Sequence, residues 1–194
     1  MGRQGSILSA VLIGILIGSY LPVMVYGQTT MLVSPEGGTV TLEGFGSVTF
    51  PPRAFSESLS VLISATQSPE TQEDFATSTE IFSVGPRLPH EIRINSGSLA
   101  PATSFEVALR VPKAFRSTLP PSFGVTVFAQ IYQDRGMEVL DHFELFPSTF
   151  DPTTQTVRAT MPKTAFTNMR HADNSYEAIV IVGSTAIPRH PPNR

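Results

Sequence analysis

The residues best suited to metal binding or acid–base chemistry are histidines, and their spacing tests both roles. The chain has four of them, His90, His142, His171 and His190. None is placed three or four residues from another histidine or from a carboxylate in a pattern typical of a metal site. His142 is flanked by Asp141 and Glu144. Because neighbouring side chains on a strand point to opposite faces, Asp141 and His142 cannot share a metal, and we expect a solvent-facing histidine beside acids.

Two other polar groups have the residue types of a metal site but too few ligands. His171-Ala172-Asp173 would place one histidine and one carboxylate on the same side of a loop, which is an incomplete zinc site. Glu70, Glu73 and Asp74 lie on an acidic stretch, whereas calcium needs more oxygen ligands around a tight turn. We expect a solvated loop there. The sequence therefore predicts no metal-ligating residue and no cofactor.

Catalysis by a nucleophile would require a hydroxyl or thiol beside an activating base. The chain has no cysteine, and it shows no G-x-S-x-G, H-E-x-x-H or Ser/His/Asp spacing. Gly37-Gly38 would hold a phosphate only in a loop between a strand and a helix, usually with a lysine, and neither a helix signal nor a lysine follows. The sequence therefore predicts that the protein is not an enzyme and names no catalytic residue.

Composition limits the classes of partner. The chain has 194 residues, of which 41% are hydrophobic and 15% charged, with a net charge of −3. This balance lacks the basic excess of a nucleic-acid-binding protein, so we expect no nucleic-acid partner. A chain of this length buries enough apolar surface to be stable without disulfides, which the absence of cysteine excludes.

Residues 1–27 have the organisation of an export signal. Arg3 is the only charge in this segment, and Ile7–Val25 is almost entirely apolar. Val25 and Gly27 are small enough for the recognition positions of a cleavage site, so we expect a signal peptide that is cleaved after Gly27. The alternative is an uncleaved membrane anchor, because an apolar run of about 20 residues spans a bilayer core of ~30 Å. We therefore expect a secreted, periplasmic or cell-envelope protein, which contacts the membrane only if this segment is retained.

Alternating apolar and polar residues predict an all-β chain, and the pattern is clearest in Ser34–Phe55. There, Thr39–Glu43 and Ser47–Phe50 alternate with period two, and Gly44-Phe45-Gly46 lies between them. A short loop that contains glycine supplies the positive φ of a tight turn, so this stretch predicts a β-hairpin.

Further strands are predicted downstream, separated by turn residues. They are Leu59–Ala65, Glu80–Gly85, His90–Asn95, Ser104–Val111, Phe123–Gln133, Met137–Phe146, Gln155–Met161 and Tyr176–Ser184. The continuous apolar run Ala178–Val182 predicts a central strand that is buried on both faces. Gln67–Thr79 is predicted to be a surface loop with at most one helical turn, and Gly85–Pro89 a turn. Short strands at this spacing favour one antiparallel β-sandwich over residues 28–186, with an N-terminal apolar signal or anchor helix and a disordered tail at 187–194.

Several short segments carry a family resemblance. Gly37–Leu42 combines a double glycine with a strand, Gly46–Phe55 an apolar strand with a double proline, and Gln155–Phe166 a threonine-rich strand with an aromatic residue. In this order they resemble the ZU-five domain family, the β-sandwich module of ankyrins, netrin receptors and zona occludens proteins, and especially its exported bacterial relatives. The resemblance implies a fold and an exported location, not a reaction. Some relatives cleave their own chain at a His-Phe-Ser step; here Ala165 replaces the histidine, so nothing activates Thr167.

These observations favour a non-enzymatic, exported interaction or scaffold module whose loops bind a protein partner in the cell envelope or outside the cell. The candidate loops are Gln67–Thr79, Arg116–Ser122 and Thr167–Ser175. One alternative is a carbohydrate or cell-wall binding module, for which Phe45, Tyr132 and Phe150 would be the exposed aromatic residues. A second alternative is a membrane-anchored accessory subunit.

Overall fold

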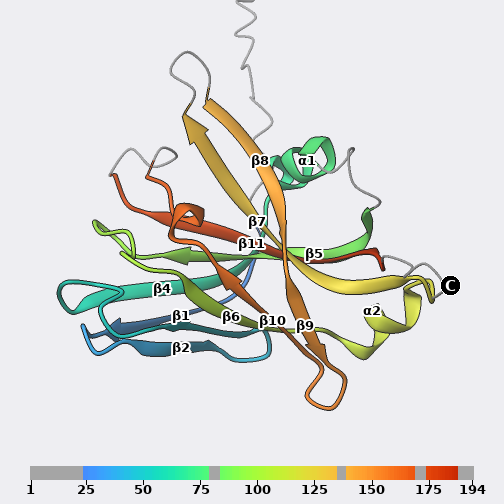
Figure 1. Ribbon diagram of the computed structural model, residues 1–194, viewed down its shortest axis with the longest axis horizontal. Helices are drawn as coiled ribbons and strands as arrows, with labels where there is room; N and C mark the ends of the chain where they lie inside the picture. The colour runs from blue at the N-terminus through green and yellow to red at the C-terminus, as the bar shows by residue number, and fades with distance from the viewer. Residues whose placement is uncertain (1–23, 79–83, 135–138, 169–173, 188–194) are drawn as a thin grey trace, which may run out of the picture.

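The computed structural model describes residues 24–78, 84–134, 139–168 and 174–187, which form two antiparallel β-sheets (Figure 1). The six-stranded sheet contains, in spatial order, β1 (Met24–Val33), β4 (Leu59–Gln67), β5 (Val84–Asn95), β11 (Glu177–Ala186), β7 (Phe123–Asp134) and β8 (Val139–Phe146). The five-stranded sheet contains β2 (Gly38–Leu42), β3 (Gly46–Phe50), β6 (Phe105–Arg110), β10 (Thr156–Met161) and β9 (Ser148–Asp151). The helical elements are α1 (Pro69–Ser78), α2 (Lys113–Thr118) and the short η2 (Lys163–Ala165). The predicted all-β class is confirmed.

The hydrophobic core lies between the two sheets, because each strand turns its alternate apolar residues toward the other sheet. Val48 and Val107 come from the five-stranded sheet, Ile94 and Val180 from the six-stranded sheet, and all four are completely buried. Each side chain of this kind stabilises the fold by roughly 1.5–3 kcal/mol on full burial. The period-two pattern of the sequence thus gives each sheet one apolar face.

The predicted hairpin of Ser34–Phe55 is confirmed, and its second glycine shows why this turn needs that residue. Val40 in β2 pairs with Val48 in β3. Gly46 has a φ of +142°, and a Cβ built there would lie 2.3 Å from the carbonyl oxygen of Ala108 in β6. A side chain at this position would therefore push the hairpin away from its neighbouring strand.

The predicted central strand is also confirmed, as β11. It pairs with β5 on one side and with β7 on the other. Ala178–Val182 is buried throughout, because the second sheet covers one face and α1 covers the other (Figure 1).

Two local predictions are wrong. Gln67–Thr79 is not a loop with a single turn, since α1 extends over Pro69–Ser78 and packs on the outer face of the six-stranded sheet. Gly85–Pro89 is not a turn, because β5 continues through it to Asn95. The register between β5 and β11 shifts around Gly183. Such an irregularity interrupts the ladder of hydrogen bonds, so Pro86 and Pro89 can lie within β5.

The predicted signal segment 1–27 is only partly described, because the described structure starts at Met24. β1 begins there, inside the predicted segment 1–27, and forms the edge of the six-stranded sheet. Residues 1–23 of the predicted signal or anchor helix, residues 188–194 of the predicted tail and residues 80–83 of the predicted strand Glu80–Gly85 lie outside the described residues. Within the described ranges, no helix has the length and apolar character required to cross a membrane.

Candidate functional site

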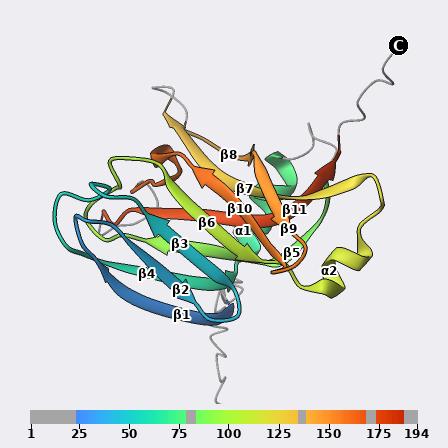
Figure 2. The ribbon, with the colours of Figure 1, turned by 60° about the horizontal axis from the view of Figure 1, so that its bottom comes forward.

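The outer face of the five-stranded sheet is rich in hydroxyl and charged groups. Both α-helices lie away from β2 and β3 (Figure 2). Thr39 and Thr49 on these strands are 2.9 Å apart through their hydroxyl oxygens. Farther across the face, β6 and β10 contribute Glu106, Arg110 and Arg158, because residues two apart on a strand share a face.

Two adjoining hollows lie at one end of this face, where the β2–β3 turn meets β6 and β10. They measure about 430 and 440 Å³, and both are lined by Gly44 and Arg110. The first lies over a row of paired residues, Ser47, Ala108 and Arg158, on three neighbouring strands. The small side chains of Ser47 and Ala108 leave a depression beside the long side chains of Arg110 and Arg158. The second hollow continues past Arg110 to Lys113 and Gln155, and we call the two together the basic groove.

The charges of the basic groove are only partly neutralised. Arg158 Nη1 donates to Glu106 Oε1 over 2.9 Å, and both side chains are about half exposed. Such surface pairs contribute about 0–1 kcal/mol, so Arg158 can exchange Glu106 for another carboxylate at little cost. In the described part of the chain, the Arg110 and Lys113 side chains make no ion pair or hydrogen bond. They remain available to a ligand.

Gln155 gives the second hollow an unused acceptor. Its backbone lies in the left-handed region, with a φ of +53°, and its Nε2 donates to the carbonyl oxygen of Pro152 over 2.6 Å. Its Oε1 is buried and accepts no hydrogen bond from any described residue. A buried acceptor without a donor is costly, so this oxygen is an unsatisfied group in the wall of the groove.

The turn that carries Gln155 is fixed by Asp151. Asp151 Oδ2 accepts from the Thr154 hydroxyl over 2.8 Å, and Oδ1 accepts from the Thr153 backbone N–H over 2.8 Å. These bonds, led by that from the Thr154 hydroxyl, lower the pKa of the Asp151 carboxyl. This turn connects β9 to β10 and forms one wall of the groove.

Of the histidines highlighted by the sequence, the structure describes His90 and His142, and they lie in different surroundings. His142 Nε2 lies 3.0 Å from Glu144 Oε1, the acid on its own face of β8. His90 lies instead among aromatic rings, and burial lowers its pKa. His171, Asp173 and His190 lie outside the described residues. No group of three metal-ligating side chains occurs among the residues that the structure describes.

A buried charge network beneath α1 escaped the sequence reasoning. Arg93 Nη1 donates to Glu177 Oε2 over 3.1 Å, and Arg93 Nε lies 3.2 Å from Glu91 Oε1. Glu91 is completely buried and also accepts from the Thr66 hydroxyl over 3.1 Å. Arg93 Nη2 donates to the Thr71 hydroxyl of α1 over 3.0 Å. The alternation predicted a polar face for β5, but a face covered by α1 could be recognised only in three dimensions.

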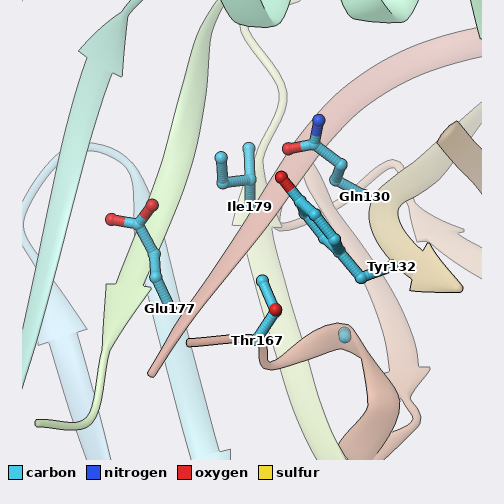
Figure 3. A pocket seen from close by; sticks show the side chains of 6 residues that line it. Gln130, Tyr132, Thr167, Glu177 and Ile179 are labelled. Atoms are coloured by element: carbon cyan, nitrogen blue, oxygen red, sulfur yellow. The ribbon is translucent and has the colours of Figure 1, made fainter. Parts of the chain in front are cut away.

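A narrow crevice beside this network is lined by Gln130, Tyr132, Thr167, Glu177 and Ile179 (Figure 3). Gln130 Oε1 is buried there and has no partner among the described residues. The crevice is nevertheless too narrow to admit a water molecule, so it offers no space for a ligand. Thr167, the counterpart of the self-cleaving residue, exchanges two backbone hydrogen bonds with Glu177.

The aromatic residues expected on a carbohydrate-binding surface do not form an exposed platform. Phe45 and Phe150 are partly buried and pack against the core between the sheets. Tyr132 is half-buried in the crevice on the opposite sheet. The groove itself lies where the sequence had predicted only ordinary strands and turns. The sequence contains little indication of the groove, because Arg110 and Arg158 lie on separate strands that are far apart in the chain.

Comparison with known proteins leaves the family open. No family model matches this chain, and no curated protein matches its sequence. Membership of the ZU-five family therefore stays a prediction.

Proposed function

We propose that this protein is a non-enzymatic, exported β-sandwich module that binds an acidic segment of a partner protein in the basic groove. The supporting observation is that Arg110 and Lys113, both without partners in the described structure, face two adjoining hollows on an uncovered sheet face. Export rests on the apolar N-terminal run of the sequence.

The chemistry of the groove suits carboxylates joined to a peptide backbone. The fork of N–H groups on Arg110 matches both oxygens of an aspartate or glutamate side chain. Oε1 of Gln155 is buried in the wall beside Arg110, and a backbone N–H of the same segment would reach it once this side chain turned toward the groove. β6 fixes the backbone of Arg110, and the hydrogen-bonded turn after β9 fixes that of Gln155.

An acidic glycan offers similar charges, but the lining of the groove favours a peptide. None of the described residues that line either hollow is aromatic. Aromatic rings provide large contact areas of defined geometry, and a sugar-binding surface would require them here. The acidic glycan is therefore kept as an outcome of the test.

The test is titration of the protein with a synthetic oligoglutamate peptide and, separately, with oligogalacturonate. Charge-assisted hydrogen bonds contribute about 1.5–3 kcal/mol, so Arg110→Glu should weaken peptide binding by roughly tenfold or more. Arg116→Glu makes the same change of charge on exposed α2, outside the groove, and should leave the affinity nearly unchanged. Circular dichroism checks that both variants are folded.

Two results would contradict the proposal. Equal weakening by Arg110→Glu and Arg116→Glu would show a diffuse charge effect rather than a site. Binding of oligogalacturonate without binding of the peptide would assign the groove to acidic glycans.

A further inference from the structure

The exposed large hydrophobic side chains are concentrated on one edge strand. Among the described residues six such side chains are exposed, and five of them, Met24, Val25, Tyr26, Met31 and Leu32, lie on β1. Edge strands of soluble proteins are usually protected by charges or by a covering element. β1 carries no charged residue, and its only partner in the sheet is β4. Such an edge indicates contact with an apolar environment.

The residues before β1 show which environment this is. The apolar run Ile7–Val25 leads into the strand without a polar linker, and its last two residues, Met24 and Val25, are already paired with β4. About 20 apolar residues suffice to cross a bilayer core of ~30 Å. The first residues of β1 would therefore lie directly at the surface of any membrane that held this run.

Tyr26 is held by the fold at this point. Its hydroxyl donates to Gln67 Oε1 over 2.6 Å, and its ring centre lies 6.1 Å from that of His90. The side chain nevertheless remains 47% exposed. Tyrosine is enriched where a membrane meets water, because its ring is apolar and its hydroxyl is polar. Cleavage after Gly27 would remove Tyr26 and the first three pairs between β1 and β4.

We infer that the apolar N-terminal segment is retained as a membrane anchor. Met24, Val25 and Tyr26 then hold the N-terminal end of β1 against the lipid headgroups. The occupant of this surface is thus a lipid bilayer. Leu32, near the C-terminal end of β1, lies six residues after Tyr26. Six residues of strand cover about 20 Å, so Leu32 would lie well away from the bilayer surface. This inference is independent of the ligand of the basic groove.

The natural absence of tryptophan allows a direct test. The full chain is reconstituted in phosphatidylcholine vesicles that contain brominated lipid, which quenches only nearby tryptophan. Tyr26→Trp should lose at least about half of its fluorescence relative to vesicles without bromine, as expected for an interfacial ring. Leu32→Trp is the matched control, since Leu32 is 64% exposed on the same strand, and it should keep its fluorescence. Val25→Trp replaces Tyr26→Trp if the latter does not fold.

Two observations would overturn the inference. The first is a mature protein, purified from the exporting cell, whose N-terminal sequence starts at Gln28. The second is equal quenching by brominated lipid in Tyr26→Trp and Leu32→Trp, or quenching in neither. The N-terminal end of β1 would then have no special contact with lipid.

Discussion

The imidazole of His90 lies between two aromatic rings that come from different sheets. Tyr26 belongs to β1, and Phe45 lies in the β2–β3 turn, with its ring centre 5.1 Å from that of His90. Burial in this position lowers the pKa of His90, because the charged imidazolium loses hydration. The neutral imidazole is therefore the form that packs between Tyr26 and Phe45 in the folded protein.

His90 should make stability depend on pH. Its pKa is lower in the folded chain than in the unfolded chain, where it is about 6.5, so protonation favours unfolding. The contribution is complete above about pH 6.5 and is lost as the pH falls from there through the folded pKa. Urea unfolding at several pH values should show a loss of free energy in the wild type that His90→Gln lacks. Parallel pH profiles for the two proteins would contradict this role.

At the scale of elements, α1 is held on the six-stranded sheet by one aromatic side chain and several polar contacts. Phe75 is 4% exposed and meets Phe128 and Phe143 at ring-centre distances of 5.1 and 5.2 Å. The guanidinium carbon of Arg87 lies 4.9 Å from the centre of the Phe75 ring. Beside it, Asp74 Oδ2 accepts from Gln130 Nε2 over 3.1 Å. The helix thus exists because the sheet provides partners for it.

Phe75→Ala should therefore destabilise the protein strongly. Removing a buried phenylalanine costs about 3–5 kcal/mol, as lost apolar burial plus the cavity left behind. Glu70→Gln, at an exposed position in the first turn of the same helix, should change the free energy of unfolding by less than about 1 kcal/mol. Urea denaturation of both variants measures the difference. A small effect of Phe75→Ala would mean that α1 is not firmly packed on the sheet.

At the scale of the whole molecule, the two sheets share one core and have no disulfide to join them. Side chains from both inner faces interlock, so neither sheet can keep its apolar face buried after the other unfolds. This arrangement favours a single cooperative transition.

Tryptophan reporters on the two sheets should unfold together. Leu32→Trp marks β1, and Thr160→Trp marks the exposed face of β10 in the other sheet. Each variant is unfolded in urea and followed by fluorescence and circular dichroism. For each, the two signals should have the same midpoint. A fluorescence midpoint separate from that of circular dichroism would show that one sheet unfolds independently.

The sequence by itself determined the class of the fold and the inward face of most strands, because period-two alternation is a local property. It predicted the β2–β3 hairpin and the buried centre of β11 for this reason. The tertiary structure decided what depends on contacts between distant residues. Packing of Phe75 against Phe128 stabilises a helix in a polar segment. Arg110, Gln155 and Arg158 meet in one groove, because the pairing of strands far apart in the chain fixes which side chains lie together.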